Sequence, residues 1–241
     1  MLKNLILNNT SENYLKKLYF LSKKKWFFWI VAIFFCLYFL LGSLSQGRYI
    51  YDGFHWGLLA SNANDLLNGK LPYKDFFVHY GILTLVFQSI ALKIYNSIYS
   101  LIFLSSILYF FSTINMLIIL KKFSNNYFAY LFLFILFFCQ PYAVYPWHVY
   151  FIYFFITTGL LFFFKKTLTS IFFFGFFVQL CFLSSEAFKI CSYLISIAVF
   201  FIFFLENKKN YSKFFKFFIS YFFGFIAPLI IFLLLLNFSG T

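Results

Sequence analysis

The sequence predicts an all-α, polytopic integral membrane protein with about seven transmembrane helices. Sixty-three per cent of the 241 residues are hydrophobic, 10% are charged, and the mean hydropathy is +0.89. A water-soluble domain is usually only about 45–50% apolar. Long apolar runs also alternate with short polar segments, as expected when helices cross a hydrocarbon core about 30 Å thick.

Lysine-containing or polar segments mark the ends of the apolar runs. Residues 1–25 end in three lysines, which is typical of a cytoplasmic flank, so we predict a cytoplasmic segment over 1–25 and a single membrane domain over 26–241. The first run is longer than the apolar core of a signal peptide, which has about 7–15 residues, and we interpret it as an uncleaved span. The predicted spans are Trp26–Ser45, Ile98–Leu120, Tyr127–Gln140, Val149–Phe164, Leu168–Ser184, Ala187–Leu205 and Phe214–Asn237.

The distribution of charge predicts the orientation of these spans. With the amino terminus inside, fourteen of the 19 basic residues fall in cytoplasmic segments, and four of the six acids fall outside. This is the asymmetry of the positive-inside rule, and we expect the chain in a bacterial inner (plasma) membrane. The lysines do not form a basic face with interleaved aromatic residues, so the net charge of +13 does not predict a nucleic-acid partner.

Residues 46–97 form the longest segment that is neither a predicted span nor a short turn. If Gly81–Ser97 crossed the membrane, the basic pair Lys121-Lys122 would move outside, so we predict an amphipathic helix lying on the outer leaflet instead. Trp56–Leu67 has an apolar side formed by its leucines, whereas Asn62, Asn64 and Asp65 interrupt any spanning run, and we predict a second interfacial helix there. The outer loop would therefore hold two surface helices.

The same loop carries motifs that resemble a known superfamily. Asp-Gly-Phe-His-Trp-Gly, from Asp52 to Gly57, resembles the Asp-Glu-x-His-Phe-Gly signature of protein O-mannosyltransferases, and Phe77-Val78-His79 resembles their Phe-x-Val-His. The segment LLNGKLPYKDFFVHYG is similar to a Gly-x-x-Pro-Tyr-x-Asp loop of bacterial GT-C glycosyltransferases, which include the lipid A aminoarabinose transferases. Members of this superfamily are longer, so the resemblance predicts either a fragment or a stand-alone membrane module.

The resemblance implies transfer of a sugar from a polyprenyl-phosphate donor to a glycan, lipid or protein acceptor outside the cytoplasm. Such a reaction needs a general base at the acceptor hydroxyl and positive charge at the departing phosphate. We assign the base to Asp52, with His55 three residues on to orient it or to contact phosphate. Asp52 is also the residue we assign to a divalent metal ion if the reaction uses one. The alternatives are a helix-capping acid and a plain interfacial histidine.

Six further residues are candidates for substrate binding. Asp75 and His79 follow each other closely in the loop, where Asp75 could instead be a structural turn acid; Lys70 and Lys74 could bind the donor phosphate or anionic lipid headgroups. Glu186 and Lys189 lie between two apolar runs, where ionisable groups are costly and indicate a functional site. Their spacing of three also allows a mutual ion pair.

The hydropathy pattern also fits other classes of protein. A non-catalytic polytopic protein, such as a component of a flippase or transporter or a structural subunit, has the same hydropathy. A transporter would be expected to show broken spans in two matching halves, whereas only Pro228 interrupts a predicted span. The four cysteines lack the paired spacing of a zinc site or disulfide framework.

Overall fold

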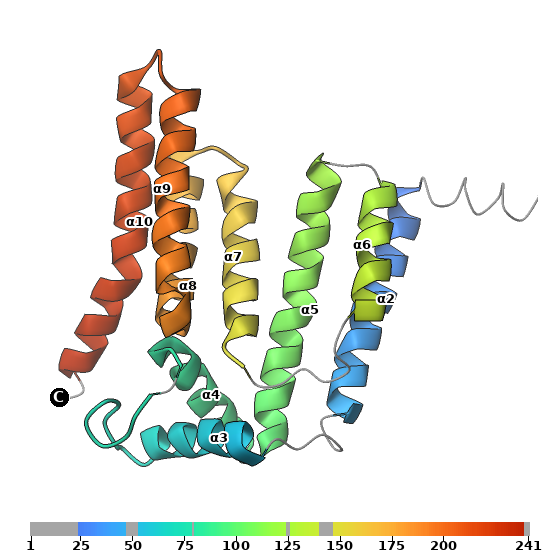
Figure 1. The fold of residues 1–241 in the computed structure, drawn as a ribbon, viewed down its shortest axis with the longest axis vertical. Coiled ribbons are helices and arrows are strands. Elements are labelled where there is room, and N and C mark those ends of the chain that lie inside the picture. The colour runs from blue at the N-terminus through green and yellow to red at the C-terminus, as the bar shows by residue number, and fades with distance from the viewer. Residues whose placement is uncertain (1–23, 47–52, 79, 124–125, 140–146, 239–241) are drawn as a thin grey trace, which may run out of the picture.

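A computed structural model of the chain describes residues 24–46, 53–78, 80–123, 126–139 and 147–238 (Figure 1). The described residues form helices and turns without a β-sheet, which confirms the all-α prediction for this part of the chain. In chain order the helices are α2 (Lys25–Gln46), α3 (Gly53–Leu67), α4 (Ile82–Ile94), α5 (Ile98–Phe123), α6 (Asn126–Cys139), α7 (Val149–Phe163), α8 (Leu168–Ser184), the short 3-10 helix η1 (Glu186–Phe188), α9 (Lys189–Glu206) and α10 (Tyr211–Phe238).

Three of the described helical segments are long and apolar enough to cross a membrane: Ile98–Phe123, Glu186–Glu206 and Tyr211–Leu234. The 15 residues of α7 span only about 22 Å at 1.5 Å per residue, less than the hydrocarbon core of about 30 Å. Seven spans therefore stay a prediction. The three long helices are compatible with an integral membrane protein.

The long helices stand side by side, and successive helices from α5 to α10 alternate in direction (Figure 1). The carboxyl ends of α5, α7 and α9 lie at one end of the bundle, whereas α3 and α4 lie at the other, with α3 crossing it. We call the first end the lysine end, because the pairs 121–122, 165–166 and 208–209 lie at or just after these three helix ends. The second is the α3–α4 end.

Small residues allow a close approach between α8 and α10. A Cβ atom on Gly175 would overlap the carbonyl oxygen of Tyr221, and one on Gly224 would overlap that of Phe172. The Ser220 hydroxyl also donates to the carbonyl oxygen of Leu168 over 2.7 Å. Glycines that bring two backbones together are a recurring feature of helix pairs in membranes.

Helix α9 exposes one long apolar face. Ile190, Leu194, Ile197, Phe201 and Leu205 each expose more than half of their surface, and all belong to the same 18-residue helix. Contiguous apolar surface of this kind is rare on water-soluble monomers. The face therefore indicates contact with lipid or with another apolar helix.

The lysine pair 165–166 lies in the turn between the end of α7 and the start of α8. Lys166 has a positive φ of 53°, the left-handed conformation that commonly ends a helix. Thr167 then caps α8: its hydroxyl accepts from the Ser170 amide, and the Ser170 hydroxyl accepts from the Thr167 amide. The polar run Lys-Lys-Thr-Leu-Thr-Ser thus reverses the chain in few residues.

Candidate functional site

The carboxyl end of α8 is tied to the amino end of α4 by two hydrogen bonds. The carbonyl oxygen of Ser184 accepts from the Gly81 amide over 3.1 Å and from the Thr84 hydroxyl over 2.8 Å. A helix leaves its last carbonyl groups without helical partners, so these donors satisfy an acceptor that would otherwise be buried unbonded. A Cβ atom at Gly81 would overlap the backbone of Ser184, which explains the glycine.

Helix α3 is fixed against α4 and against the segment between them. The Ser89 hydroxyl on α4 donates to the carbonyl oxygen of Ala63 on α3 over 3.0 Å. The Asn62 side chain, which is buried, donates to the carbonyl oxygen of Phe77 over 3.0 Å. The first bond joins α4 to α3, and the second ties Phe77, in a segment without a helix, to α3.

A tight turn over residues 71–76 presents Tyr73 at its tip. The Asp75 carboxylate accepts from the Leu71 amide over 2.7 Å, and the Tyr73 amide donates to the carbonyl oxygen of Phe76 over 2.9 Å. Tyr73 has a positive φ of 65°, an uncommon conformation for a residue with a Cβ atom that costs about 1–2 kcal/mol. The surrounding hydrogen bonds hold this strained residue in place.

Tyr73 faces η1 and the start of α9 across an open pocket. The pocket has a volume of about 740 Å³ and is lined by Tyr73, Phe77, Val78, Glu186 and Lys189. The Tyr73 hydroxyl donates to Oε1 of Glu186 over a long 3.4 Å, while Oε2 of Glu186 forms an ion pair with Lys189. Residues 113 positions apart in the chain thus form one polar group at the α3–α4 end.

The environment of this pocket keeps Tyr73 protonated. Partial desolvation of the ring, the negative charge of Glu186 and the hydrogen bond between the two raise the pKa of Tyr73 above its ordinary value. At neutral pH the hydroxyl is therefore a hydrogen-bond donor. The pocket accordingly offers a cation at Lys189, an anion at Glu186 and a neutral donor at Tyr73.

The other described candidates have separate surroundings, and none of them lines this pocket. Lys70 forms an ion pair with Asp65 over 2.8 Å, and Asp75 is bonded within its own turn. Lys74 is exposed and has no ion pair with the described residues. His55, near the start of α3, is half-buried and meets the Trp147 ring edge-on with centroids 6.0 Å apart.

Two of the predicted site residues, Asp52 and His79, lie outside the described residues. Within the described segments, no three side chains of His, Cys, Asp or Glu gather closely enough to hold one metal ion. The metal assignment to Asp52 stays a prediction.

Sequence reasoning identified Glu186 and Lys189 but missed Tyr73. Pro72 and Asp75 mark a turn around it, yet no sequence pattern indicates that the tip of this turn faces residues more than a hundred positions later. Comparison of the chain with protein-family profiles, with curated proteins and with solved structures finds no match. The residues and their geometry are thus the basis for any functional proposal.

Proposed function

We propose that this chain is a membrane glycosyltransferase of GT-C type, which moves a sugar from a polyprenyl-phosphate donor to an acceptor hydroxyl on the extracytoplasmic side. The observation that carries the proposal is the pocket at the α3–α4 end, where Tyr73, Glu186 and Lys189 meet. A phosphate-linked donor needs a cation at its leaving group, and Lys189 offers one in the pocket.

The distribution of lysines between the two ends of the bundle supports an orientation for this proposal. Eight of the 14 described basic residues lie in or beside the ends of α5, α7 and α9 or near the start of α10: Lys121, Lys122, Lys165, Lys166, Lys208, Lys209, Lys213 and Lys216. The positive-inside rule assigns such segments to the cytoplasm. With seven spans and a cytoplasmic amino terminus, the α3–α4 end then faces out. Helices α3 and α4 would lie at the outer leaflet, next to a lipid-linked donor.

The reaction can be written with groups of this chain. The bond between the sugar C1 and the phosphate oxygen breaks, and a bond between C1 and the acceptor oxygen forms. The hydroxyl proton of the acceptor passes to a carboxylate, which we assign to Asp52 with His55 as its neighbour. The departing polyprenyl phosphate keeps the bonding electrons, and its charge is stabilised by Lys189 and by the hydrogen bond that Tyr73 can donate.

Glu186 has a separate role in this scheme. In the described structure it holds the Lys189 ammonium group, so an arriving phosphate competes with Glu186 for Lys189. Because both side chains are substantially exposed, this exchange costs little. Lys70, Lys74, Asp75 and His79 would bind the donor or acceptor at the rim, as the resemblance to the superfamily implies.

The test is donor turnover by the purified full chain in proteoliposomes. Polyprenyl-phosphate monosaccharides are supplied together with a bacterial membrane-lipid extract as acceptor, and released polyprenyl phosphate is measured. We expect release by the natural chain and a loss of about 100-fold in Lys189→Gln, because a charged donor to the leaving group is removed. Tyr73→Phe is expected to lose less, since one neutral donor is removed.

The matched control is Lys93→Gln, which removes an exposed lysine from α4 without touching the pocket. It should retain the natural rate. Release of polyprenyl phosphate at equal rates in Lys189→Gln and the natural chain would refute the site, and no release from any donor would refute the activity.

A further inference from the structure

A groove separate from the Tyr73 pocket lies at the lysine end, between α5 and α7. It has a volume of about 380 Å³, and its walls include Ile118 and Ile119 from α5 and Leu161 and Phe162 from α7. Lys122 and Lys165 stand at the same groove. The surface of the bundle thus carries an apolar groove flanked by two lysines, at the end opposite the pocket of Tyr73.

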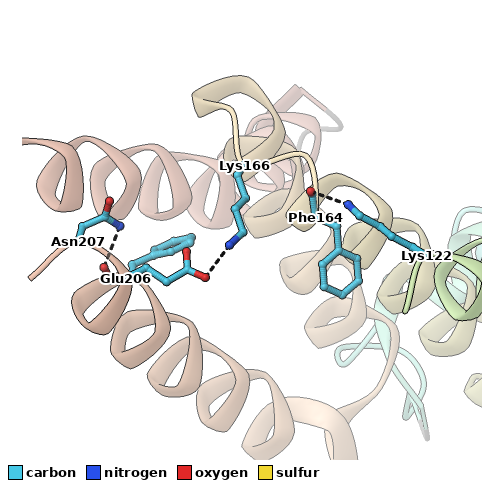
Figure 2. A network of polar contacts seen from close by, with 6 residues as sticks. Lys122, Phe164, Lys166, Glu206 and Asn207 are labelled. Carbon is cyan, nitrogen blue, oxygen red and sulfur yellow. Dashed lines mark hydrogen bonds and ion pairs between the residues drawn. The ribbon is translucent and has the colours of Figure 1, made fainter. Parts of the chain in front are cut away.

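Contacts with α7 hold both lysines at this position. Nζ of Lys122 donates to the carbonyl oxygen of Phe164 over 2.8 Å, at the point where α7 ends (Figure 2). Nζ of Lys165 lies 5.0 Å from the centre of the Phe162 ring. The single bond to Phe164 leaves Lys122 with two further N–H donors. Both side chains therefore keep donors that can contact an anion.

The local carboxylate does not neutralise these lysines. Glu206 is the acid of the described part of the lysine end, and it is paired with Lys166 over 2.6 Å (Figure 2). Lys122 and Lys165 have no carboxylate partner among the described residues. The groove therefore carries about two uncompensated positive charges beside an apolar wall.

We propose that this groove binds one anionic phospholipid, with its phosphate between Lys122 and Lys165 and an acyl chain along Ile118, Ile119, Leu161 and Phe162. A basic pocket between membrane helices on the cytoplasmic side suits such headgroups. A soluble anion would satisfy the lysines but leave the apolar wall in contact with water. A phospholipid satisfies both, because its charge and its hydrocarbon are joined in one molecule.

The experiment is a lipid titration of the detergent-solubilised full chain, followed by native mass spectrometry. Phosphatidylglycerol is compared with phosphatidylcholine, which has no net charge. We expect one tightly retained phosphatidylglycerol and an apparent affinity that falls about fivefold for each lysine removed in Lys122→Gln and Lys165→Gln. Equal retention of the two lipids would overturn the proposal.

Two further variants separate the groove from general attraction to the lysine end. The double variant Lys208→Gln, Lys209→Gln removes the same charge from the α9–α10 turn and should leave the tight binding unchanged. Ile118→Trp places a larger side chain in the groove from an exposed position on its wall, and it should weaken binding although both lysines remain. An equal loss in the α9–α10 variant, or no loss in Ile118→Trp, would show that the lipid is held by surface charge alone.

Discussion

The two ends of the bundle use polar side chains in different ways. At the α3–α4 end, Thr84, Ser89 and Asn62 donate to backbone carbonyl groups of other segments, and all three side chains are buried. At the lysine end, two interactions between segments use exposed charged groups: Lys166 pairs with Glu206, and Lys122 donates to the carbonyl oxygen of Phe164. One end is fixed by buried hydrogen bonds, and the other is left charged and accessible.

This difference indicates which end can hold a site of defined geometry. A buried hydrogen bond is costly to leave unmade, so it fixes the relative position of the segments that it joins. The turn with Tyr73 and the residues Glu186 and Lys189 are positioned by the contacts around Ser184 and Phe77. Exposed lysines can instead follow a headgroup, which suits attraction to an anionic membrane surface.

The largest effect is expected from a direct test of which side each end faces. In a background with Cys139 and the exposed Cys191 changed to serine, single cysteines are introduced as Asn68→Cys, between α3 and α4, and Lys209→Cys, between α9 and α10. A membrane-impermeant maleimide added to intact cells should label the first, and the second only after lysis. Labelling of both from one side would contradict the opposed ends.

The next effect should come from breaking the contact between α4 and α8. Gly81 has an ordinary φ of −82°, so the glycine is needed for space and not for backbone freedom. Gly81→Ala places a Cβ atom against the backbone of Ser184, which cannot move as a side chain can. We expect the free energy of unfolding in mixed micelles to fall by about 3 kcal/mol.

Gly57→Ala on α3 is the matched control, because a Cβ atom there meets nothing within 4 Å. Alanine favours a helix over glycine by about 1 kcal/mol, so this variant should be as stable as the natural chain or more stable. If Gly81→Ala unfolded at the same denaturant concentration as Gly57→Ala, the tight contact at Ser184 would not contribute to the fold.

The sequence was a good guide to the helices, because each one is encoded locally. The predicted run Leu168–Ser184 coincides with α8, and the run predicted over Tyr127–Gln140 differs from α6 by one residue at each end. The run predicted over Gly81–Ser97 contains the 13-residue α4. Apolar runs, lysine pairs and glycines mark these limits without reference to any distant residue.

The candidate site was less predictable, because it depends on contacts between distant segments. Glu186 and Lys189 stand out as charges between apolar runs, and their ion pair follows from their spacing. Tyr73 is one of 19 tyrosines; Pro72 and Asp75 place it in a turn, but nothing near it indicates that it contacts Glu186. Only the docking of α4 on Ser184 and of Asn62 on Phe77 brings it to Glu186.

The smallest effect is expected at the lysine end, from the pair between Lys166 and Glu206. The exposed fractions of the two side chains are 52% and 40%, so water screens their attraction although the two atoms are 2.6 Å apart. A double-mutant cycle with Lys166→Gln and Glu206→Gln should give a coupling free energy below about 1 kcal/mol. The coupling should decrease further as salt is added. A coupling free energy as large as the decrease in stability expected for Gly81→Ala would contradict this comparison. The exposed pair would then stabilise the lysine end as strongly as the buried contact between α4 and α8 stabilises the other end.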